Sequence, residues 1–478
     1  MDIQKYLENK KLWLLVILVL VILTLTTTYY GSTDIGDYAD SARLFAGKYR
    51  ADIRNSHSYV FGFFHAPYFF LFNNWLVFKI SSLVFLLATV FSVYYIKNKD
   101  KRFLWLMLLS PAVWYMAPWI NPIQIASLGM LWSWFFIQKY DESNGPRILL
   151  YSGIFLGLAW AFWNTILFLG FFLWAVFLMN KKLYHTITFF IGTMIGLMPL
   201  FLLDYSLFGF PFYTLIKTTM SNFVATLLGG IYGGSSSSFS VLNVVLLLLT
   251  IPLFFWPNLK KISKTNLFLM FSLLLFLVNP QIRYAMSIIP IMVASYKIDK
   301  YFKATLIFSL AISLIFIVPY IYQVKSPLAT PSFQGDIKDL IENKKFASQT
   351  EINSRIISDL SNIALDYPRE SFIVGPNPDD YGELARLYWR DDIVEFVSIQ
   401  DYQAHLNDDF NLFSKEWRPI PKFNERRQIW VSGGMSVNEN DPTNFTSLRY
   451  AISTNSENIE GFILIKSYDQ LNLWEKNQ

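Results

Sequence analysis

The 478-residue chain contains no cysteine. This absence excludes disulfides, thiolate catalysis and cysteine-bound zinc, but it leaves the compartment open, because many extracytoplasmic proteins also lack disulfides. Acidic residues are scarce as well: the first 324 residues hold 11 Asp and Glu against 24 Lys and Arg. The sequence has no repeat period, glycine-rich fingerprint or Walker lysine, so we interpret Gly433-Gly434 as a turn rather than a nucleotide loop. We expect no nucleic-acid partner.

Apolar residues are abundant. Hydrophobic residues make up 53% of the chain and aromatic residues 18%, and the mean hydropathy is +0.34. One soluble core could not use so much apolar surface, which predicts a polytopic α-helical membrane protein surrounded by membrane lipids. About eleven apolar runs come close to the twenty residues that a helix needs to cross the bilayer. They are residues 12–30, 67–96, 103–117, 122–138, 148–163, 165–180, 186–204, 239–256, 266–280, 284–297 and 304–322.

Basic residues fall in alternate connections between these runs. By the positive-inside rule those connections are cytoplasmic, and the opposite connections, which include the long loops 31–66 and 205–238, lie outside. No convincing cleavage site follows the first run, which we expect to be a retained anchor. The basic positions are Lys5, Lys10, Lys11, Lys97, Lys99, Lys101, Arg102, Lys139, Arg147, Lys181, Lys182, Lys260, Lys261, Lys264, Lys297, Lys300 and Lys303.

The composition changes near Ser326, where the long apolar runs stop. From residue 325 onward the chain holds 24 acidic and 16 basic residues. Helical and strand patterns alternate there, which predicts a small α/β layer structure. We therefore expect a transmembrane domain over 1–325 and, because the span number is odd, an extracytoplasmic α/β domain over 326–478. The expected helices are 336–344, 350–366 and 379–389, and the expected strands are 371–376, 393–397, 428–432 and 461–465.

Carboxylates gather directly after the first span. Asp34, Asp37, Asp40 and Asp52 share the loop 31–66, and Asp204 is the fifth acid expected outside. Asp34 and Asp37 fit a helix cap and a first-turn acid of a helix over 38–47. They also fit a partly desolvated pair in which Asp34 is a general base, or a pair that binds Mg or Mn. The residues alone leave these interpretations open, whereas Asp40 and Asp52 fit solvated surface acids.

Several short motifs resemble a known family. Thr33-Asp34-Ile35-Gly36-Asp37-Tyr38, then residues 40–45 (DSARLF), 47–49 (GKY) and 65–68 (HAPY), resemble the first outer loop of membrane-embedded GT-C glycosyltransferases. The similarity is greatest to mannosyltransferases that use a polyprenyl-phosphate sugar, including the first mannosyltransferase of GPI-anchor synthesis. Residues 279–284 (NPQIRY) and Pro290 resemble a second, later motif of the same superfamily. The chain departs from the pattern where Gly36 turns D-x-D into D-x-x-D, where no proline precedes Tyr49, and where His65-Ala66-Pro67 replaces an aromatic and proline pair.

The resemblance implies a donor, an acceptor and a set of site residues. The donor would be a dolichyl or other polyprenyl phosphate carrying a hexose, mannose foremost, and the acceptor a hydroxyl of a glycan, a lipid-linked glycan or a protein at the outer face. Asp34 would be the general base of an inverting transfer, with Asp37 as a second catalytic carboxylate. No cofactor is required beyond a divalent cation, if any, on Asp34 and Asp37. The substrate contacts implied are Arg283 for the phosphate, then His65, His57 and Arg54, with Tyr38 and Tyr284 from the motifs and Lys217 as a weaker candidate.

Other functions stay open at this point. Arg283 alone fits an interfacial residue whose guanidinium reaches the headgroups, and His65 fits an interfacial side chain. An oligosaccharyltransferase would share the span plan, but the W-W-D-Y-G signature of that family is absent from the tail. A transporter would be expected to bury polar or charged groups within its spans, and Asn164 and Gln124 are almost all that this sequence offers. A scaffold would leave the acids of the first loop unexplained.

Overall fold

The structure is a computed structural model that describes the residues in several ranges of the chain. These are residues 8–27, 38, 41–42, 45–46, 59–72, 76–143, 145–215, 244–245, 247, 263–278, 282–298, 300–321, 355–356, 358–363, 365–367, 371–374, 395–398, 449–454 and 458–477. The chain divides into two compact units. Unit 1 comprises Met1–Thr27, Phe78–Phe201 and Ser236–Pro327, and unit 2 comprises Thr28–Val77, Leu202–Ser235 and Leu328–Gln478.

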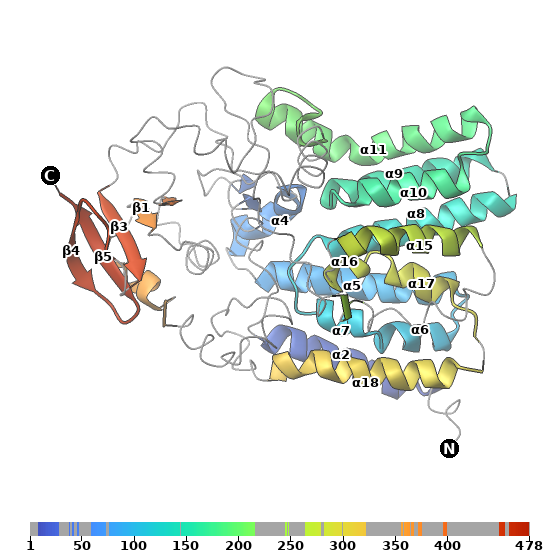
Figure 1. Cartoon of the computed structure of the whole chain (residues 1–478), viewed down its shortest axis with the longest axis horizontal. Coiled ribbons are helices and arrows are strands. Elements are labelled where there is room, and N and C mark those ends of the chain that lie inside the picture. The colour runs from blue at the N-terminus through green and yellow to red at the C-terminus, as the bar shows by residue number, and fades with distance from the viewer. Residues whose placement is uncertain are drawn as a thin grey trace. The chain divides into compact units, whose positions relative to one another are not determined.

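Unit 1 is a helical bundle whose helices lie side by side (Figure 1). Its long helices follow the predicted apolar runs to within a few residues at most ends. They are α2 (Lys10–Thr26), α5 (Leu76–Ile96), α8 (Ile123–Ser143), α9 (Pro146–Phe162), α10 (Ile166–Phe177), α11 (Leu183–Phe208), α15 (Lys264–Val278) and α18 (Phe302–Ile321). Most of the predicted run 239–256 lies outside the described residues.

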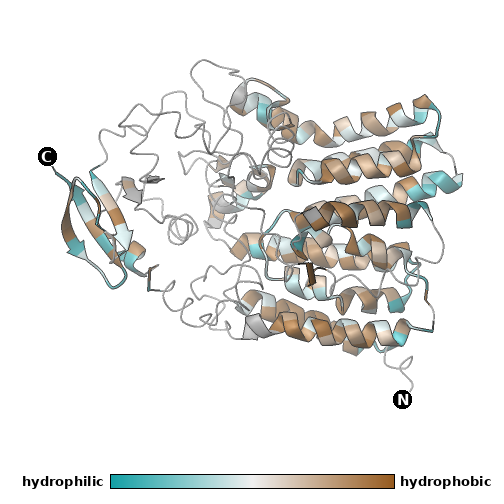
Figure 2. Ribbon diagram, in the orientation of Figure 1, coloured by the Kyte–Doolittle hydropathy of each residue, from teal (hydrophilic) through white to brown (hydrophobic). Residues whose placement is uncertain are grey.

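Apolar side chains cover the outside of this bundle as well as its interior. Leu14 of α2 is 52% exposed, and Ile307 and Leu314 of α18 are 63% and 55% exposed. Figure 2 shows hydrophobic residues along the helices and hydrophilic ones gathered near their ends. By length and composition, two of the described helical segments, Leu76–Ile96 and Leu183–Leu207, could each cross a membrane alone. An apolar exterior of this kind is what lipid tails require.

Two predicted spans are interrupted helices. The run 103–117 forms α6 (Lys101–Leu108) and α7 (Pro111–Met116), and the run 284–297 forms α16 (Ile282–Ala285) and α17 (Ile289–Ser295). A proline stands at the start of both α7 and α17, where its missing N–H costs no helical hydrogen bond. α7 packs against α16, and α6 packs against α17. The expectation of one span over 67–96 was also wrong, because this run forms α4 (Tyr59–Phe72) and α5.

Four glycines allow α9 and α11 to cross closely. A methyl group added at Gly153 of α9 would lie against the carbonyl oxygen of Phe189, and one added at Gly157 would lie against that of Thr193. Gly192 and Gly196 of α11 would do the same against the carbonyls of Leu150 and Ile154. Both helices therefore carry a G-x-x-x-G face, the pattern that brings helix backbones together in membranes.

Unit 2 contains α4 and a five-stranded mixed sheet. The strands are β1 (Ser371–Val374), β2 (Glu395–Ser398), β3 (Tyr450–Thr454), β4 (Phe462–Ser467) and β5 (Leu471–Lys476), in the order β2-β1-β3-β5-β4. β1 pairs in parallel with β2 and β3, whereas β5 is antiparallel to β3 and β4. Three predicted strands are confirmed at β1, β2 and β4, but β3 and β5 were not predicted. The predicted strand 428–432 and the helices 336–344 and 379–389 lie outside the described residues.

A helical segment supports the turn between β4 and β5. Residues 358–363 are helical, within the predicted helix 350–366. Asp359 is 4% exposed, and its Oδ2 accepts hydrogen bonds from the amides of Gln470 and Leu471, at 2.6 and 3.1 Å. The carboxylate thereby satisfies two backbone donors of the turn, which anchors the hairpin to the helix.

Candidate active site

The predicted site residues divide between described and undescribed parts of the chain. Asp34, Asp37, Arg54 and His57 lie outside the described residues. Lys217 also lies outside them. Tyr38 and His65 are described in unit 2, and Arg283 and Tyr284 are described in unit 1. The roles of all these residues stay predictions.

The residues that follow the D-x-x-D motif pack against α4. Tyr38 is 4% exposed, and its ring meets Phe61 edge-on with 5.2 Å between centroids. Ser41 is buried opposite Gly62, where an added methyl group would overlap the Ser41 side chain and lie 2.9 Å from the Ala42 amide nitrogen. An aromatic contact therefore fixes Tyr38 on α4, and the absence of a side chain at Gly62 lets Ser41 pack closely against the same helix.

His65 is fully buried in α4. Its Nδ1–H donates to the Phe61 carbonyl at 2.7 Å, so in the neutral ring Nε2 carries the lone pair. Phe61 and Phe64 surround the ring, with centroids at 4.4 and 5.1 Å. Burial lowers the pKa of His65 to about 4, and its hydrogen bond to Phe61 only partly opposes that effect. At neutral pH the side chain is therefore uncharged, which suits a hydrogen-bonding role better than charge stabilisation.

A buried hydrogen-bond chain joins α4 to the end of α11. The Thr214 amide donates to Asp204 Oδ2 at 2.8 Å, and the Thr214 hydroxyl donates to Asp204 Oδ1 at 2.7 Å. Because that hydroxyl proton is committed to Asp204, the Tyr59 hydroxyl donates to Thr214 Oγ1. All three residues are at most 2% exposed. Asp204 was counted among the outer acids, and the structure assigns it to this anchor.

Arg283 lies on aromatic rings at one end of unit 1. Its guanidinium carbon is 5.8 Å from the centre of the Trp119 ring and 5.4 Å from that of Tyr284. Tyr284 in turn packs against Trp163, with 5.5 Å between centroids. The rings come from the connection α7–α8, from α16 and from the connection α9–α10. Flat rings of this kind orient a guanidinium and attract its charge, which makes Arg283 a suitable ligand for an anion.

Buried polar side chains hold the connection that carries Trp119. Gln124 Nε2 donates to the carbonyls of Met116 and Trp119, at 3.0 and 3.1 Å. Asn121 Oδ1 accepts the Ile123 amide at 2.9 Å, as a helix-capping side chain does. Gln124 was noted in the sequence as a polar group within a span, and its role here is to fix the backbone beneath Arg283 rather than to line a pathway.

Comparisons with known proteins identify the fold. No family model matches the chain, and no curated protein matches it. A solved structure, ArnT from Cupriavidus metallidurans in the apo state, matches over 97% of this chain and 97% of that chain, with a TM-score of 0.52 and 11% sequence identity. The chain has the fold of ArnT. At 11% identity the likeness extends to the fold alone, and it supports the predicted polytopic α-helical membrane fold.

One buried charge of this ArnT-like fold was not among the predicted site residues. Lys79 lies in the first turn of α5, is fully buried, and its Nζ donates to the Thr27 carbonyl at 2.5 Å. Thr27 caps the C-terminal end of α2, where a cation is favoured, and it precedes the acidic loop. A lone lysine within an apolar run was the signal that could have found it, since charges inside spans are costly and functional as a rule.

A bound metal ion needs several carboxylate or imidazole groups close together. Within the described segments of the ArnT-like fold, no three His, Asp or Glu side chains come together as a metal site would require. Asp34 and Asp37, the expected metal ligands if there are any, lie outside those segments. A requirement for Mg or Mn therefore stays a prediction.

Proposed function

We propose that this protein is a membrane glycosyltransferase that moves a sugar from a polyprenyl phosphate to an acceptor hydroxyl at the outer face of the membrane. The sugar we propose is a hexose, with mannose as the first candidate, and dolichyl phosphate is one form of the donor lipid. The acceptor is a glycan, a lipid-linked glycan or a protein.

The observation that carries the proposal is the fold shared with ArnT along almost the whole of both chains. ArnT is a GT-C family undecaprenyl-phosphate-aminoarabinose transferase. A fold alone does not determine a reaction, because function depends on the groups placed in it. Two groups of this chain support the assignment: Arg283 on its aromatic platform, and the acidic loop 31–66, which follows Thr27, the residue that Lys79 binds.

The reaction needs a base and a stabilised leaving group. Asp34 takes the proton of the acceptor hydroxyl, whose oxygen attacks the anomeric carbon of the sugar. The bond between that carbon and the phosphate oxygen breaks on the opposite side, so the configuration inverts and polyprenyl phosphate leaves. Arg283 stabilises the negative charge that develops on the phosphate, and its fixed position on Trp119 and Tyr284 reduces the reorganisation required.

The test uses purified protein in nanodiscs with labelled polyprenyl-phosphate mannose and, separately, polyprenyl-phosphate glucose. We expect saturable donor binding and transfer to added acceptor. Asp34→Asn should bind donor normally but lose transfer by at least about 100-fold, the usual cost of removing a general base. Arg283→Lys keeps the charge but loses the planar guanidinium, so it should weaken donor binding and transfer together.

Asp40→Asn is the matched control for Asp34→Asn, because it removes the same charge from the same loop at a position that we interpret as solvated. Full transfer by Asp34→Asn would rule out its role as the base while leaving the donor assignment intact. Failure of wild-type protein to bind either polyprenyl-phosphate sugar would overturn the proposed function itself.

A further inference from the structure

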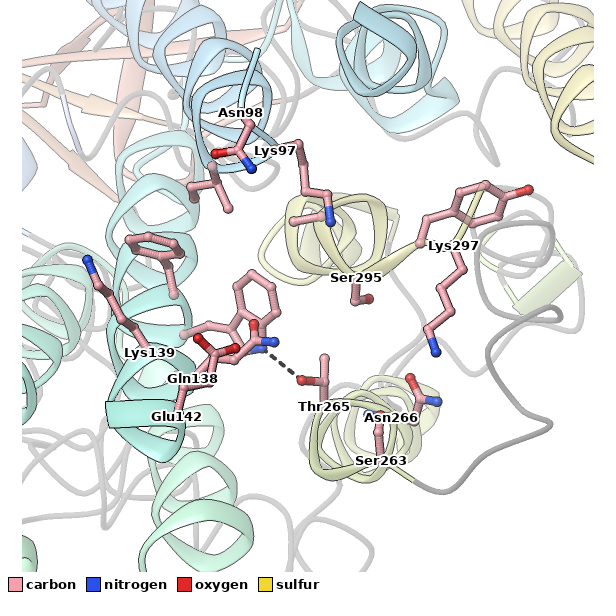
Figure 3. A pocket seen from close by; sticks show the side chains of 15 residues that line it. Lys97, Asn98, Gln138, Lys139, Glu142, Ser263, Thr265, Asn266, Ser295 and Lys297 are labelled. Atoms are coloured by element: carbon pink, nitrogen blue, oxygen red, sulfur yellow. Dashed lines mark hydrogen bonds between the residues drawn. The ribbon is translucent and has the colours of Figure 1, made fainter. Parts of the chain in front are cut away.

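A cavity opens at the end of unit 1 where the sequence places the cytoplasmic lysines. Its volume is about 760 Å³, and its lining comes from the ends of α5, α8, α15 and α17. Lys97 follows α5 and Lys297 follows α17, and Lys139 and Glu142 lie across the cavity on α8, with the Lys139 ammonium directed away from the cavity (Figure 3). Trp119 and Arg283 of the candidate active site are not among its lining residues.

The charge of the cavity is positive. Its charged lining residues are the three lysines and Glu142. The nearby acids Asp141 and Asp100 already have basic partners: Asp141 bonds to Lys264 and Lys181 at 2.6 and 3.2 Å, and Asp100 pairs with Arg102 at 2.7 Å. The cavity therefore has an excess of ammonium groups over carboxylates, which favours an anionic ligand.

The walls of the cavity combine polar and apolar groups. Asn98, Gln138 and Asn266 supply amide groups near the lysines, whereas Trp134 and Phe135 supply aromatic surface. The Trp134 indole N–H donates to Thr265 Oγ1 at 3.3 Å, which fixes that ring at the wall. Lysines with amide donors suit a phosphate group, and an adjoining aromatic wall suits the first carbons of an acyl chain.

We propose that this cavity binds the phosphate headgroup of an anionic membrane lipid. The position favours a lipid over a soluble ion, because the cavity lies at the helix ends, at the depth where headgroups meet apolar side chains. Burial lowers the pKa of Lys97, and the attraction of Asp100 only partly opposes this; the negative charge of a bound phosphate would raise that pKa again. Bound lipid would join the ends of α5, α8, α15 and α17.

The test measures binding of dihexanoyl phosphatidic acid to the purified full-length chain in maltoside detergent by isothermal titration. Dihexanoyl phosphatidylcholine and inorganic phosphate are titrated in parallel. We expect saturable binding of phosphatidic acid, with weaker binding of the other two. The double variant Lys97→Gln/Lys297→Gln should bind phosphatidic acid about 25-fold more weakly, at roughly five-fold for each lysine near a headgroup.

Lys300→Gln is the matched control, because Lys300 lies at the same end of unit 1 but outside the cavity lining. It should change binding by less than about two-fold, and thermal unfolding without ligand should show that all variants are folded. The proposal is overturned if binding of phosphatidic acid does not saturate. It is also overturned if the double variant Lys97→Gln/Lys297→Gln binds phosphatidic acid as tightly as the control Lys300→Gln. Inorganic phosphate that binds as tightly as phosphatidic acid would assign the site to a soluble ion and overturn the lipid assignment.

Discussion

Thr214 donates both its amide and its hydroxyl proton to the carboxylate of Asp204, at 2.8 and 2.7 Å, and all four atoms belong to buried residues. Asp204 lies near the end of α11, and Thr214 follows the turn at Gly209, whose positive φ of 67° suits glycine. The carboxylate therefore fixes the direction in which the chain leaves α11, and the Tyr59 hydroxyl extends the same anchor to the first turn of α4.

Asp204→Asn should destabilise unit 2 by about 2 kcal/mol. The asparagine side chain has one acceptor oxygen where the carboxylate has two, and its NH2 group would face one of the two Thr214 donors. Thr214→Val should cost a similar amount, since it leaves buried polar groups without their hydroxyl partner. Amide hydrogen exchange at residues 209–215 measures the local opening. Thr188→Val is the control: Thr188 is half-buried on α11, and its hydroxyl donates locally to the Tyr184 carbonyl. Equal exchange in Thr214→Val and wild type would contradict the anchor.

The crossing of α9 and α11 should not tolerate a methyl group. Gly157→Ala places Cβ against the Thr193 carbonyl, and the two helices must move apart at a cost of about 1–3 kcal/mol. Gly170→Ala is the matched control, because its Cβ would meet only the flexible end of Leu156. Thermal unfolding in detergent should therefore show a lower midpoint for Gly157→Ala than for Gly170→Ala. A midpoint for Gly157→Ala at the wild-type value would mean that the helices do not cross so closely.

Local sequence patterns predicted the long helices because an apolar run of about twenty residues has few alternatives in a membrane. The patterns failed where a run continues through a break. Pro111 and Pro290 stand at the starts of new helices inside apolar segments. Asn73 and Asn74 are the polar residues between α4 and α5, and two polar residues were too few to predict a break there.

The site was harder to predict for a different reason. Arg283 was found by its motif, but the platform beneath it depends on Trp119 and Trp163, which are distant in sequence. Tyr59 and Thr214 are 155 residues apart, so no local pattern could relate them. Lys79 was overlooked because a single charge hardly changes the hydropathy of its run, although its burial is what makes it important.

Lys79→Met should separate a positioning role from a contribution to stability. Methionine fills a similar volume without the cost of burying a charge, so the free energy of unfolding should stay within about 1 kcal/mol of wild type or increase. Transfer should nevertheless fall, by about ten-fold, because the Thr27 carbonyl at the base of the acidic loop loses its ammonium partner. Lys101→Met is the control, since Lys101 bonds to the Glu8 carbonyl at an exposed position. Unchanged kcat and KM in Lys79→Met would contradict a role in positioning the loop.

Stability should depend on pH through His65. In the folded state burial holds its pKa at about 4, whereas the unfolded chain has the ordinary value near 6.5. Above pH 6.5 both states are neutral at this residue, so the full stability is present there. Between pH 6.5 and 4 the unfolded chain takes up a proton that the folded chain does not. The free energy of unfolding therefore falls by up to about 1.4 kcal/mol per pH unit, and about 2 kcal/mol is lost at pH 5.

His65→Asn removes the titrating group, and its amide can still donate to the Phe61 carbonyl. Thermal unfolding from pH 7.5 to 5 should therefore give a steeper loss of stability for wild type than for His65→Asn, whereas parallel curves would show that His65 takes up its proton in the folded state as readily as in the unfolded chain.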